Sequence, residues 1–263
     1  MKKIFLLLVS IFSIGVLSSF AQVIDTMLLK CQYRLLYVRD SMYPDEIQGD
    51  VMNLEVGRKI SKFYSYDDFK SDSILDAAIR ANKPKEEIVA GRSFRINYNT
   101  YVVYTNYPEG KITVTDKIMR DYYKYLENFP AVTWKIYPET TTILDYPCQK
   151  AECRFRGRTY TVWFTNSIPV HFGPWKLSGL PGLILKAEDS QQHFVFECIS
   201  IVNPRSVITW EDRKYQLTDH KKFNQAYIRF KQNPLLGLQG MGIEIEIPNA
   251  PKKPFNPLEL KDE

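Results

Sequence analysis

The sequence predicts a mainly β (α+β) protein, built from a curved antiparallel sheet or open barrel with two or three covering helices. Two observations favour this class. Apolar and polar residues alternate with a period of two along much of the chain, most clearly on both sides of an Arg156-Gly157-Arg158 turn. Two other segments carry apolar residues at helical spacing. Because the predicted strands are long and the helices amphipathic, a curved sheet or open barrel is favoured over a closed sandwich.

The chain begins with a predicted leader. Two lysines precede the apolar run from Ile4 to Leu17, and Ser19-Phe20-Ala21 has the small residues of a cleavage site, so residues 1–21 are predicted to be a signal peptide. The run is shorter than the ~20 apolar residues of a membrane anchor. We therefore expect an exported protein, periplasmic, associated with the outer membrane or secreted, without a transmembrane span after cleavage.

Charge and length set further bounds. The net charge of +5 falls to near +3 without the leader, and no basic block with interleaved aromatic residues is present, so nucleic acid is not an expected partner. The remaining length suits one domain, predicted over 22–247, followed by a Pro-rich extended tail over 248–263.

The first half of the domain is predicted to be mostly strand. Alternation indicates strands over residues 29–39, 50–56 (which residues 59–66 extend), 93–105 and 111–115, with short strands over 134–137 and 141–144. Residues 116–129 fit both periodicities, and their aromatic content favours a strand. Between them, Ser71, Asp72 and Ser73 offer caps for a helix that ends near Asn82, with Ile74, Leu75, Ala78 and Ile79 as its apolar stripe.

The second half is organised around a predicted turn. Pro181 and Gly182 stand where a type II turn over Leu180–Leu183 requires Pro and a residue with positive φ, so Gly179, Pro181 and Gly182 are assigned a structural role. The apolar residues that follow predict a buried strand, and residues 193–202 a neighbouring strand. Thr218 then caps a helix, and residues 243–247 alternate as a last strand.

Four cysteines would meet an oxidising compartment after export. Cys148 and Cys153 are about 16 Å apart if the chain between them is extended, too far for a disulfide. Alternation places Cys153 and Cys198 toward the core, so a Cys153–Cys198 disulfide is one hypothesis and buried free thiols are the other.

Motifs of known chemistry are missing from the sequence. The three histidines, His171, His193 and His220, have no metal-ligand spacing, so no metal and no cofactor are predicted. No nucleophile elbow is present, and no catalytic residues are predicted. A hydrolase with dispersed residues is an alternative, with Ser178, His171 and Asp189 as its best trio because all three border the central loop.

Aromatic residues offer a binding hypothesis. Tyr98, Tyr101, Tyr104 and Tyr107 could form a platform for sugar or peptide, although alternation and β-propensity favour packing inside the protein. The loop before the central turn carries His171, Phe172 and Trp175, which we take as the candidate binding residues.

These residues also carry a resemblance. The Gly179-Leu180-Pro181-Gly182-Leu183-Ile184 motif and its surroundings resemble the GLPGLI family of exported bacterial proteins. The similarity extends to the residues Ser61-Lys62-Phe63-Tyr64-Ser65, Tyr146, Cys148, Lys150-Ala151, Phe155, Gly157-Arg158, Trp163-Phe164-Thr165, Ile168-Pro169, Gly173-Pro174 and Asn256-Pro257-Leu258-Glu259-Leu260. The chain departs from the family pattern in carrying Cys153 and Cys198 as additional thiols.

The resemblance implies no assigned activity and no catalytic residues, and it implies a place beside TonB-dependent outer-membrane transport systems. We therefore expect a non-catalytic exported binding or accessory protein of the cell envelope, whose partner is an outer-membrane transporter or another envelope protein. A carrier of a small apolar ligand in a cavity of the sheet is a further alternative.

Overall fold

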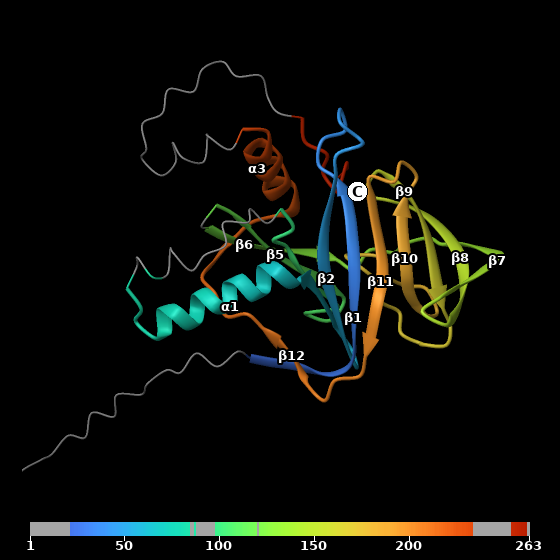
Figure 1. Ribbon diagram of the computed structural model, residues 1–263, viewed down its shortest axis with the longest axis horizontal. Helices are drawn as coiled ribbons and strands as arrows, with labels where there is room; N and C mark the ends of the chain where they lie inside the picture. Colours follow the sequence, from blue (N-terminus) through green and yellow to red (C-terminus); the bar gives the residue numbers. More distant parts are fainter. Residues whose placement is uncertain (1–21, 85–86, 88–97, 120, 234–253, 262–263) are drawn as a thin grey trace, which may run out of the picture.

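A computed structural model describes residues 22–84, 87, 98–119, 121–233 and 254–261. Within these residues the strands form one large open sheet in the order β13-β6-β5-β4-β3-β2-β1-β11-β10-β9-β8-β7, with β12 paired to β1 off this path. The strand pairings among the described residues are antiparallel except the parallel pairing of β13 with β6. The predicted class, mainly β with a curved antiparallel sheet and covering helices, is confirmed (Figure 1).

Two antiparallel meanders make up the sheet. The first consists of β1 (Gln22–Val38), β2 (Ile47–Gly57), β3 (Ser61–Ser65), β4 (Val102–Thr105), β5 (Lys111–Ile118) and β6 (Asp121–Asn128). The second consists of β7 (Lys135–Ile143), β8 (Tyr146–Phe155), β9 (Arg158–Thr165), β10 (Leu183–Asp189) and β11 (Phe194–Val202). The last strand of the second meander, β11, pairs with the first strand of the chain, β1, and this pairing joins the two halves.

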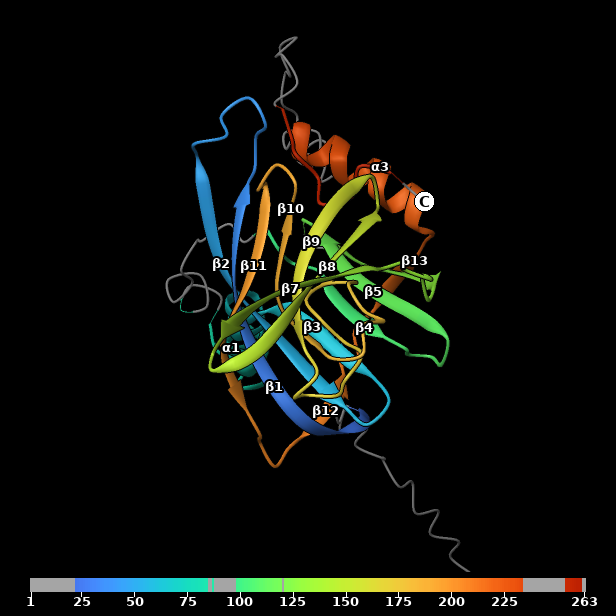
Figure 2. The same cartoon turned by 90° about the vertical axis from the view of Figure 1, so that its right-hand side faces the viewer.

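The strand β1 is the centre of the sheet. It pairs with β2 along one edge and with β11 along the other, while its first residues pair with β12 (Val207–Trp210). Its inward face carries Cys31, Tyr33, Leu35 and Tyr37, as the period-two pattern predicted, and all four side chains are buried. The same main core cluster includes residues from both meanders, so the sheet curves around a shared interior (Figure 2).

The central hairpin and its neighbours follow the prediction closely. Strands β8 and β9 pair in register from Gln149↔Phe164 to Phe155↔Arg158, and the turn between them places Arg156 and Gly157 at φ values of 51° and 82°. Two consecutive residues with positive φ are the requirement of a tight hairpin turn that matches the twist of the strands. The strand predicted after the Pro181 turn is β10, and residues 194–202 form β11 beside it.

The first helix differs from its prediction. Helix α1 (Tyr66–Arg80) begins earlier, because Ser65 caps it by accepting a hydrogen bond from the Asp68 amide. None of its residues is buried, and Ile74 and Ile79 of the predicted apolar stripe are exposed. The helix contacts β2 and β3 and is held instead by its acidic side chains, so the apolar stripe did not identify the packed face.

The second described helix, α3 (His220–Gln232), is capped by Asp219 rather than Thr218, through the Lys222 amide. Its predicted stripe faces the protein at Phe223, which is buried, and at Tyr227, which packs against the core. The helix lies against β6. Short strand β13 (Tyr215–Leu217) precedes it. No helix in the part of the chain that the structure describes is long and apolar enough to cross a membrane.

Other differences concern boundaries. Residues 61–65 form β3, a separate strand that folds back on β2, rather than an extension of it. The ambiguous segment 116–129 is strand, in β5 and β6, and the two short strands predicted after Phe129 are one strand, β7. A strand was predicted over residues 93–105. Residues 93–97 lie outside the described residues, and of residues 98–105 only Val102–Thr105 form a strand. The strand predicted over 243–247 also lies outside the described residues.

Residues 254–261 pack against the sheet without forming a helix or strand. The Asn256 amide donates to the Arg39 carbonyl at 2.8 Å, and the Leu260 amide donates to the Arg156 carbonyl at 2.9 Å. Asn256 is buried and its side-chain amide donates to the Val38 carbonyl. This segment therefore closes one side of the interior.

Candidate functional site

A cavity of about 100 Å³ lies between β4, β5 and β6, helix α3, the Trp175 loop and residues 255–259. This volume is well above the ~10–15 Å³ of accessible space that a cavity needs to hold one water molecule. Ligand sites in proteins are typically concave and largely apolar, with a few convergent polar groups. The cavity has this composition, and we take it as the candidate functional site.

Aromatic rings form most of the cavity wall. Phe223 and Tyr227 stack on α3 with their ring centroids 5.6 Å apart, and Phe255 meets Tyr227 edge-on at 5.9 Å. On the opposite side, Tyr125 of β6 lies 5.4 Å from Phe223. The wall thus combines the strands, the helix and the C-terminal segment.

Trp175 closes another part of the wall from the loop before β10. Its φ is 56°, which is unusual for a bulky residue, and its buried ring packs between Phe155 and Tyr160 with centroid distances of 5.4 and 6.2 Å. Backbone conformations of this kind are kept only where the surroundings fix them, and they are common at functional sites.

One hydroxyl at the cavity has no hydrogen-bond partner among the residues that the structure describes. It is the buried oxygen of Tyr101, and burial raises the pKa of Tyr101 well above its ordinary value, with the carboxylates of Asp50 and Asp116 adding to the effect. A buried hydroxyl without a partner costs free energy, on the order of 1–3 kcal/mol. A ligand or water that accepts from this hydroxyl would recover that energy.

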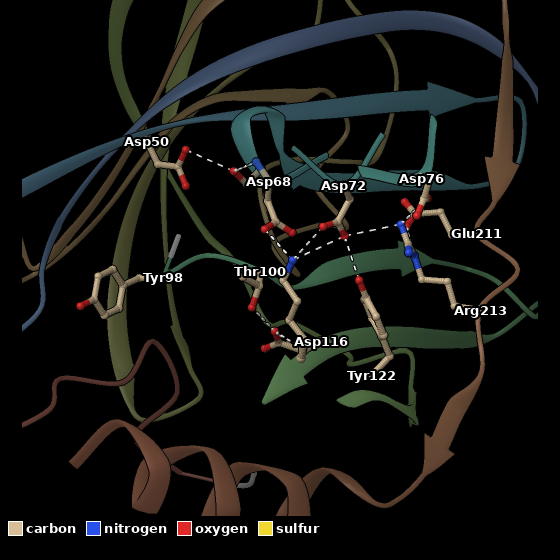
Figure 3. Close-up of polar contacts among 12 residues, drawn as sticks. Asp50, Asp68, Asp72, Asp76, Tyr98, Thr100, Asp116, Tyr122, Glu211 and Arg213 are labelled. Atoms are coloured by element: carbon tan, nitrogen blue, oxygen red, sulfur yellow. Dashed lines mark hydrogen bonds and ion pairs between the residues drawn. The ribbon is translucent and has the colours of Figure 1, made fainter. Parts of the chain in front are cut away.

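Asp116 brings a carboxyl group to the same cavity (Figure 3). Its Oδ1 accepts hydrogen bonds from the Thr100 hydroxyl and from the Lys117 amide, the latter at 2.7 Å. Burial raises the pKa of Asp116 despite these two bonds. Asn99, next to Thr100, donates to Asp50 at 3.1 Å, so residues 99–101 are fixed against two carboxyl groups.

Two cations border the aromatic wall. The guanidinium of Arg39 lies 3.7 Å from the ring centroid of Tyr98, and the ammonium of Lys231 lies 4.6 Å from the same ring. Burial lowers the pKa of Lys231 to about 8, although Asp116 acts in the opposite direction. The Tyr98 ring therefore makes cation–π contacts with two positive charges.

Acidic residues of α1 form a separate polar cluster on the other side of β5 and β6 (Figure 3). Lys117 lies 2.7 Å from Asp68 and 3.3 Å from Asp72, while Arg213 lies 3.5 Å from Asp72 and 3.2 Å from Asp76. Every one of these three carboxylates faces a cation. The cluster anchors α1 to the sheet.

A second buried ionic cluster adjoins the cavity. Lys176 lies 2.6 Å from both Glu127 and Glu259, and His220 lies 2.7 Å from Glu259. The ligand atoms of Glu127, His220 and Glu259 are close enough to hold a metal ion. Lys176 and Arg156 already supply two positive charges to these carboxylates, so the donor set fits a salt-bridge network better than a metal site.

The structure places the predicted binding residues apart. Trp175 lines the cavity. His171 is exposed, and its Nδ1 lies 2.8 Å from the Leu180 carbonyl oxygen, while Phe172 is half-buried and forms a backbone bridge with Ser178. His171 and Phe172 thus maintain the loop that carries Trp175 and do not reach the cavity.

The two glycines of the central motif do not have the roles that a type II turn would give them. Gly182 is not among the described residues with positive φ, so that part of the prediction is wrong. Gly182 is required by packing instead, because an added Cβ would lie 2.0 Å from the Thr165 carbonyl oxygen. Gly179 is the residue with positive φ, at 95°, and Pro181 is exposed. The buried strand predicted after the motif is confirmed as β10.

All four cysteines are buried free thiols, and Cys153 is not joined to Cys198. In the sheet order, β8 with Cys153 and β11 with Cys198 are separated by β9 and β10. The thiol that contacts Cys198 belongs to Cys31 of β1. The Cys153–Cys198 pairing is therefore corrected, because facing the same core did not make these residues neighbours.

The alternative catalytic trio is also not assembled. Asp189 accepts hydrogen bonds from Arg158 at 2.9 Å and from the Phe194 amide at 2.7 Å. His171 contacts Leu180, and the Ser178 hydroxyl is buried with no hydrogen-bond partner in the described part of the chain. Each member has its own surroundings, and none of these contacts links one member of the trio to another.

Most polar residues of the cavity carry no signal in the sequence that marks them as functional. The predicted sugar or peptide platform includes Tyr98 and Tyr101 of the cavity wall, but not Asn99, Asp116, Asn256 or Glu259. Asp116 lies between two strand residues and gives no local signal. Asn256 and Glu259 carried a signal only as part of the motif near the C-terminus.

The fold and the site together define an open, curved β-sheet protein with an aromatic ligand-type cavity. The family model described as N-glycanase peptide, N-terminal domain, matches residues 84–219, which is just over half of the chain. The chain belongs to this family. No curated protein matches it.

Two solved structures of PNGF-II are similar in fold. The one in space group P21 has a TM-score of 0.51 and 17% sequence identity, and the match covers 78% of this chain and 34% of that protein. The one in space group C2 has a TM-score of 0.50 and 16% identity, covering 78% and 33%. The chain therefore spans about a third of the length of these proteins, and the likeness concerns the fold.

Proposed function

We propose that this protein is an exported, non-catalytic binding or accessory protein of the cell envelope, and that its cavity binds a carbohydrate. The family supports a glycan-related role, because the matching model is the N-terminal domain of an N-glycanase. The predicted leader supports export, and so does the resemblance to the GLPGLI family of exported proteins.

The observation that carries the proposal is the composition of the cavity. Aromatic rings surround the buried hydroxyl of Tyr101, which has no partner among the described residues, and the carboxyl group of Asp116 lies in the same wall. A sugar ring has apolar C–H faces and a polar rim of hydroxyl groups. Its faces would pack on the rings while its rim bonds to the polar groups, and this combination favours a carbohydrate over a purely apolar or a highly charged ligand.

The size of the cavity limits what can enter. About 100 Å³ is small beside the ~300–1,000 Å³ of typical ligand pockets, so only part of a glycan, such as an acetamido group, would enter, and the rest of the ligand would lie outside the cavity. Glycans carry such groups at their ends. We therefore expect binding of a terminal residue rather than of the interior of a chain.

Isothermal titration and NMR with N-acetylglucosamine, its β-linked dimer, mannose and galactose test the proposal. We expect saturable binding of at least one sugar. Tyr101→Phe removes only the hydroxyl and should weaken that binding roughly tenfold, in line with ~1.4 kcal/mol for one hydrogen bond in a buried site. The control is Tyr43→Phe, since Tyr43 is exposed.

Two results would contradict this function. One is the absence of binding of every sugar at millimolar concentration. The other is equal affinity of Tyr101→Phe and the unchanged protein, which would remove the cavity from the interaction. We also propose that the protein associates with an outer-membrane transporter. Affinity purification from solubilised envelopes tests this, and recovery of the protein alone would argue against it.

The aromatic wall also favours a second candidate, a carrier of a small apolar ligand. The rings of Phe223, Tyr227 and Phe255 contribute apolar surface next to the polar groups. Organic extraction of the purified protein followed by mass spectrometry distinguishes the two. A stoichiometric apolar compound would favour the carrier, and its absence together with sugar binding would exclude it.

A further inference from the structure

Two of the buried thiols face each other at the joint between the two meanders. Cys31 belongs to β1 and Cys198 to β11, the two strands whose pairing unites the sheet. Both side chains are buried, and the thiol of Cys31 is close enough to Cys198 to interact with it. Cys148 also lies within electrostatic range of Cys198, but its thiol donates to the Tyr146 carbonyl, and Cys153 is paired across the hairpin with Tyr160.

The register explains the contact. Tyr33 is opposite Cys198 and Cys31 is opposite Ile201, with a bulge on the ladder between Gln32 and Tyr33. Cys31 and Cys198 are therefore diagonal neighbours on the inward face of the sheet. Diagonal neighbours lie about 7–8 Å apart between Cα atoms, and a disulfide spans up to about 7 Å. A bulge increases the local twist, and a small movement of the backbone there would complete the approach.

We propose that Cys31 and Cys198 form a disulfide bond when the protein folds in an oxidising compartment. Each thiol loses its hydrogen, one S–S bond forms, and two protons and two electrons leave. The electrons reduce a disulfide compound, either a small-molecule disulfide or the active-site disulfide of a thiol oxidoreductase, to two thiols. The reaction passes through a mixed disulfide on one of the two cysteines.

The bond has to form before the core closes. The interaction with Cys198 and burial raise the pKa of Cys31 well above its ordinary value, so the reactive thiolate is strongly disfavoured in the folded protein. In the unfolded chain both thiols are accessible and have ordinary reactivity. Oxidation therefore accompanies the pairing of β1 with β11 and does not follow it.

The test uses the purified full chain, unfolded in urea with reductant and refolded in a mixture of reduced and oxidised glutathione. Remaining thiols are then alkylated, and peptides are identified by mass spectrometry. We expect a Cys31–Cys198 disulfide with Cys148 and Cys153 alkylated. Alkylation of all four cysteines, or a bridge that includes Cys148 or Cys153, would overturn the proposal.

Two variants extend the test. Cys31→Ala should leave a product with three alkylated thiols, whereas the matched Cys153→Ala should still form the bridge. The oxidised protein should also unfold at a higher urea concentration than the reduced protein, and an equal midpoint with the bridge present would contradict a stabilising role. Export is part of the proposed function, but this experiment is made in vitro, so its outcome is separate from that of sugar binding.

Discussion

The ammonium group of Lys176 lies 2.6 Å from a carboxylate oxygen of Glu127, and both side chains are almost fully buried. Lys176 comes from the loop before β10, whereas Glu127 belongs to β6, and in the sheet order these strands lie far apart. The pair therefore spans the interior of the curved sheet, with Glu259 and Arg156 as further members.

Removing the charge of Lys176 should destabilise the protein strongly. In Lys176→Met, Glu127 and Glu259 lose their shared cation and remain buried, and breaking such a pair typically costs about 3–5 kcal/mol. The matched control is Lys186→Met, because Lys186 and Glu188 form a more exposed pair at 2.9 Å, worth at most about 1 kcal/mol. Urea unfolding measures both, and equal losses would contradict a structural role of the network.

The glycines of the central motif should respond differently to alanine. In Gly182→Ala the new Cβ would collide with the Thr165 backbone, so we expect a loss of several kcal/mol or failure to fold, among the largest effects of single substitutions. In Gly179→Ala, only positive φ opposes the change, and the expected loss is about 1–2 kcal/mol. Gly110→Ala is the control for the effect of positive φ alone, because Gly110 has a φ of 75° and no atom lies within 4 Å of an added Cβ. A larger loss at Gly179 than at Gly182 would refute this assignment.

Arg158 should control the attachment of residues 254–261. Its buried guanidinium donates to the side chain of Asn256 and to the carbonyls of Pro257 and Leu258, besides pairing with Asp189. Lysine keeps the charge but cannot make this set of bonds. In Arg158→Lys we expect the backbone amide hydrogens of Asn256 and Leu260 to exchange with solvent at least about tenfold faster. This corresponds to a loss of ~1.4 kcal/mol in the free energy of local opening.

Arg154→Lys, at an exposed position of the same hairpin, is the control for hydrogen exchange. It should leave both amides protected. Unchanged protection in Arg158→Lys would show that other contacts hold the segment.

Lys231 should make stability depend on pH in the alkaline range. Burial lowers its folded pKa to about 8, whereas the unfolded value is about 10.4. Between these values the unfolded chain binds more protons, so the contribution of Lys231 to the free energy of unfolding rises with pH. Below pH 8 both states are protonated, and the penalty for burying the charge is constant.

Urea midpoints between pH 7 and 10.5 check this expectation. As the pH rises through this window, the urea midpoint of the unchanged protein should increase relative to that of Lys231→Met. Lys222→Met serves as control, since that lysine is 80% exposed. Parallel profiles for the unchanged protein and Lys231→Met would exclude a lowered pKa.

The sequence predicted the fold class and most strands because alternation reports directly on which residues face the core. The inward residues of β1, the hairpin of β8 and β9 and the buried β10 follow from this local pattern. Helix α1 shows the limit of such reasoning. Ile74 and Ile79 of its apolar stripe are exposed because Lys117 and Arg213, distant in sequence, bind the acidic face.

The candidate site could be predicted only in part. Trp175 and the tyrosines near Tyr98 were recognised from their type and position, but the cavity depends on how α3 and residues 255–259 approach β6. That approach is set by long-range contacts such as Glu259 with Lys176 and Asn256 with Val38. Period-two and helical patterns contain no information about such pairs. The same limit explains why Cys31 was not recognised as the neighbour of Cys198.

The pairing of β1 with β11 also has a consequence for biosynthesis. Tyr37 pairs with Phe194, so at 5–20 residues per second the ribosome needs roughly 8–30 s to supply the partner after the first strand has emerged. During this interval one edge of an apolar strand has no partner, and such edges promote aggregation. A chain exported unfolded would delay that hazard until all strands are present, and a holding chaperone would have to protect β1 in any setting where folding begins earlier.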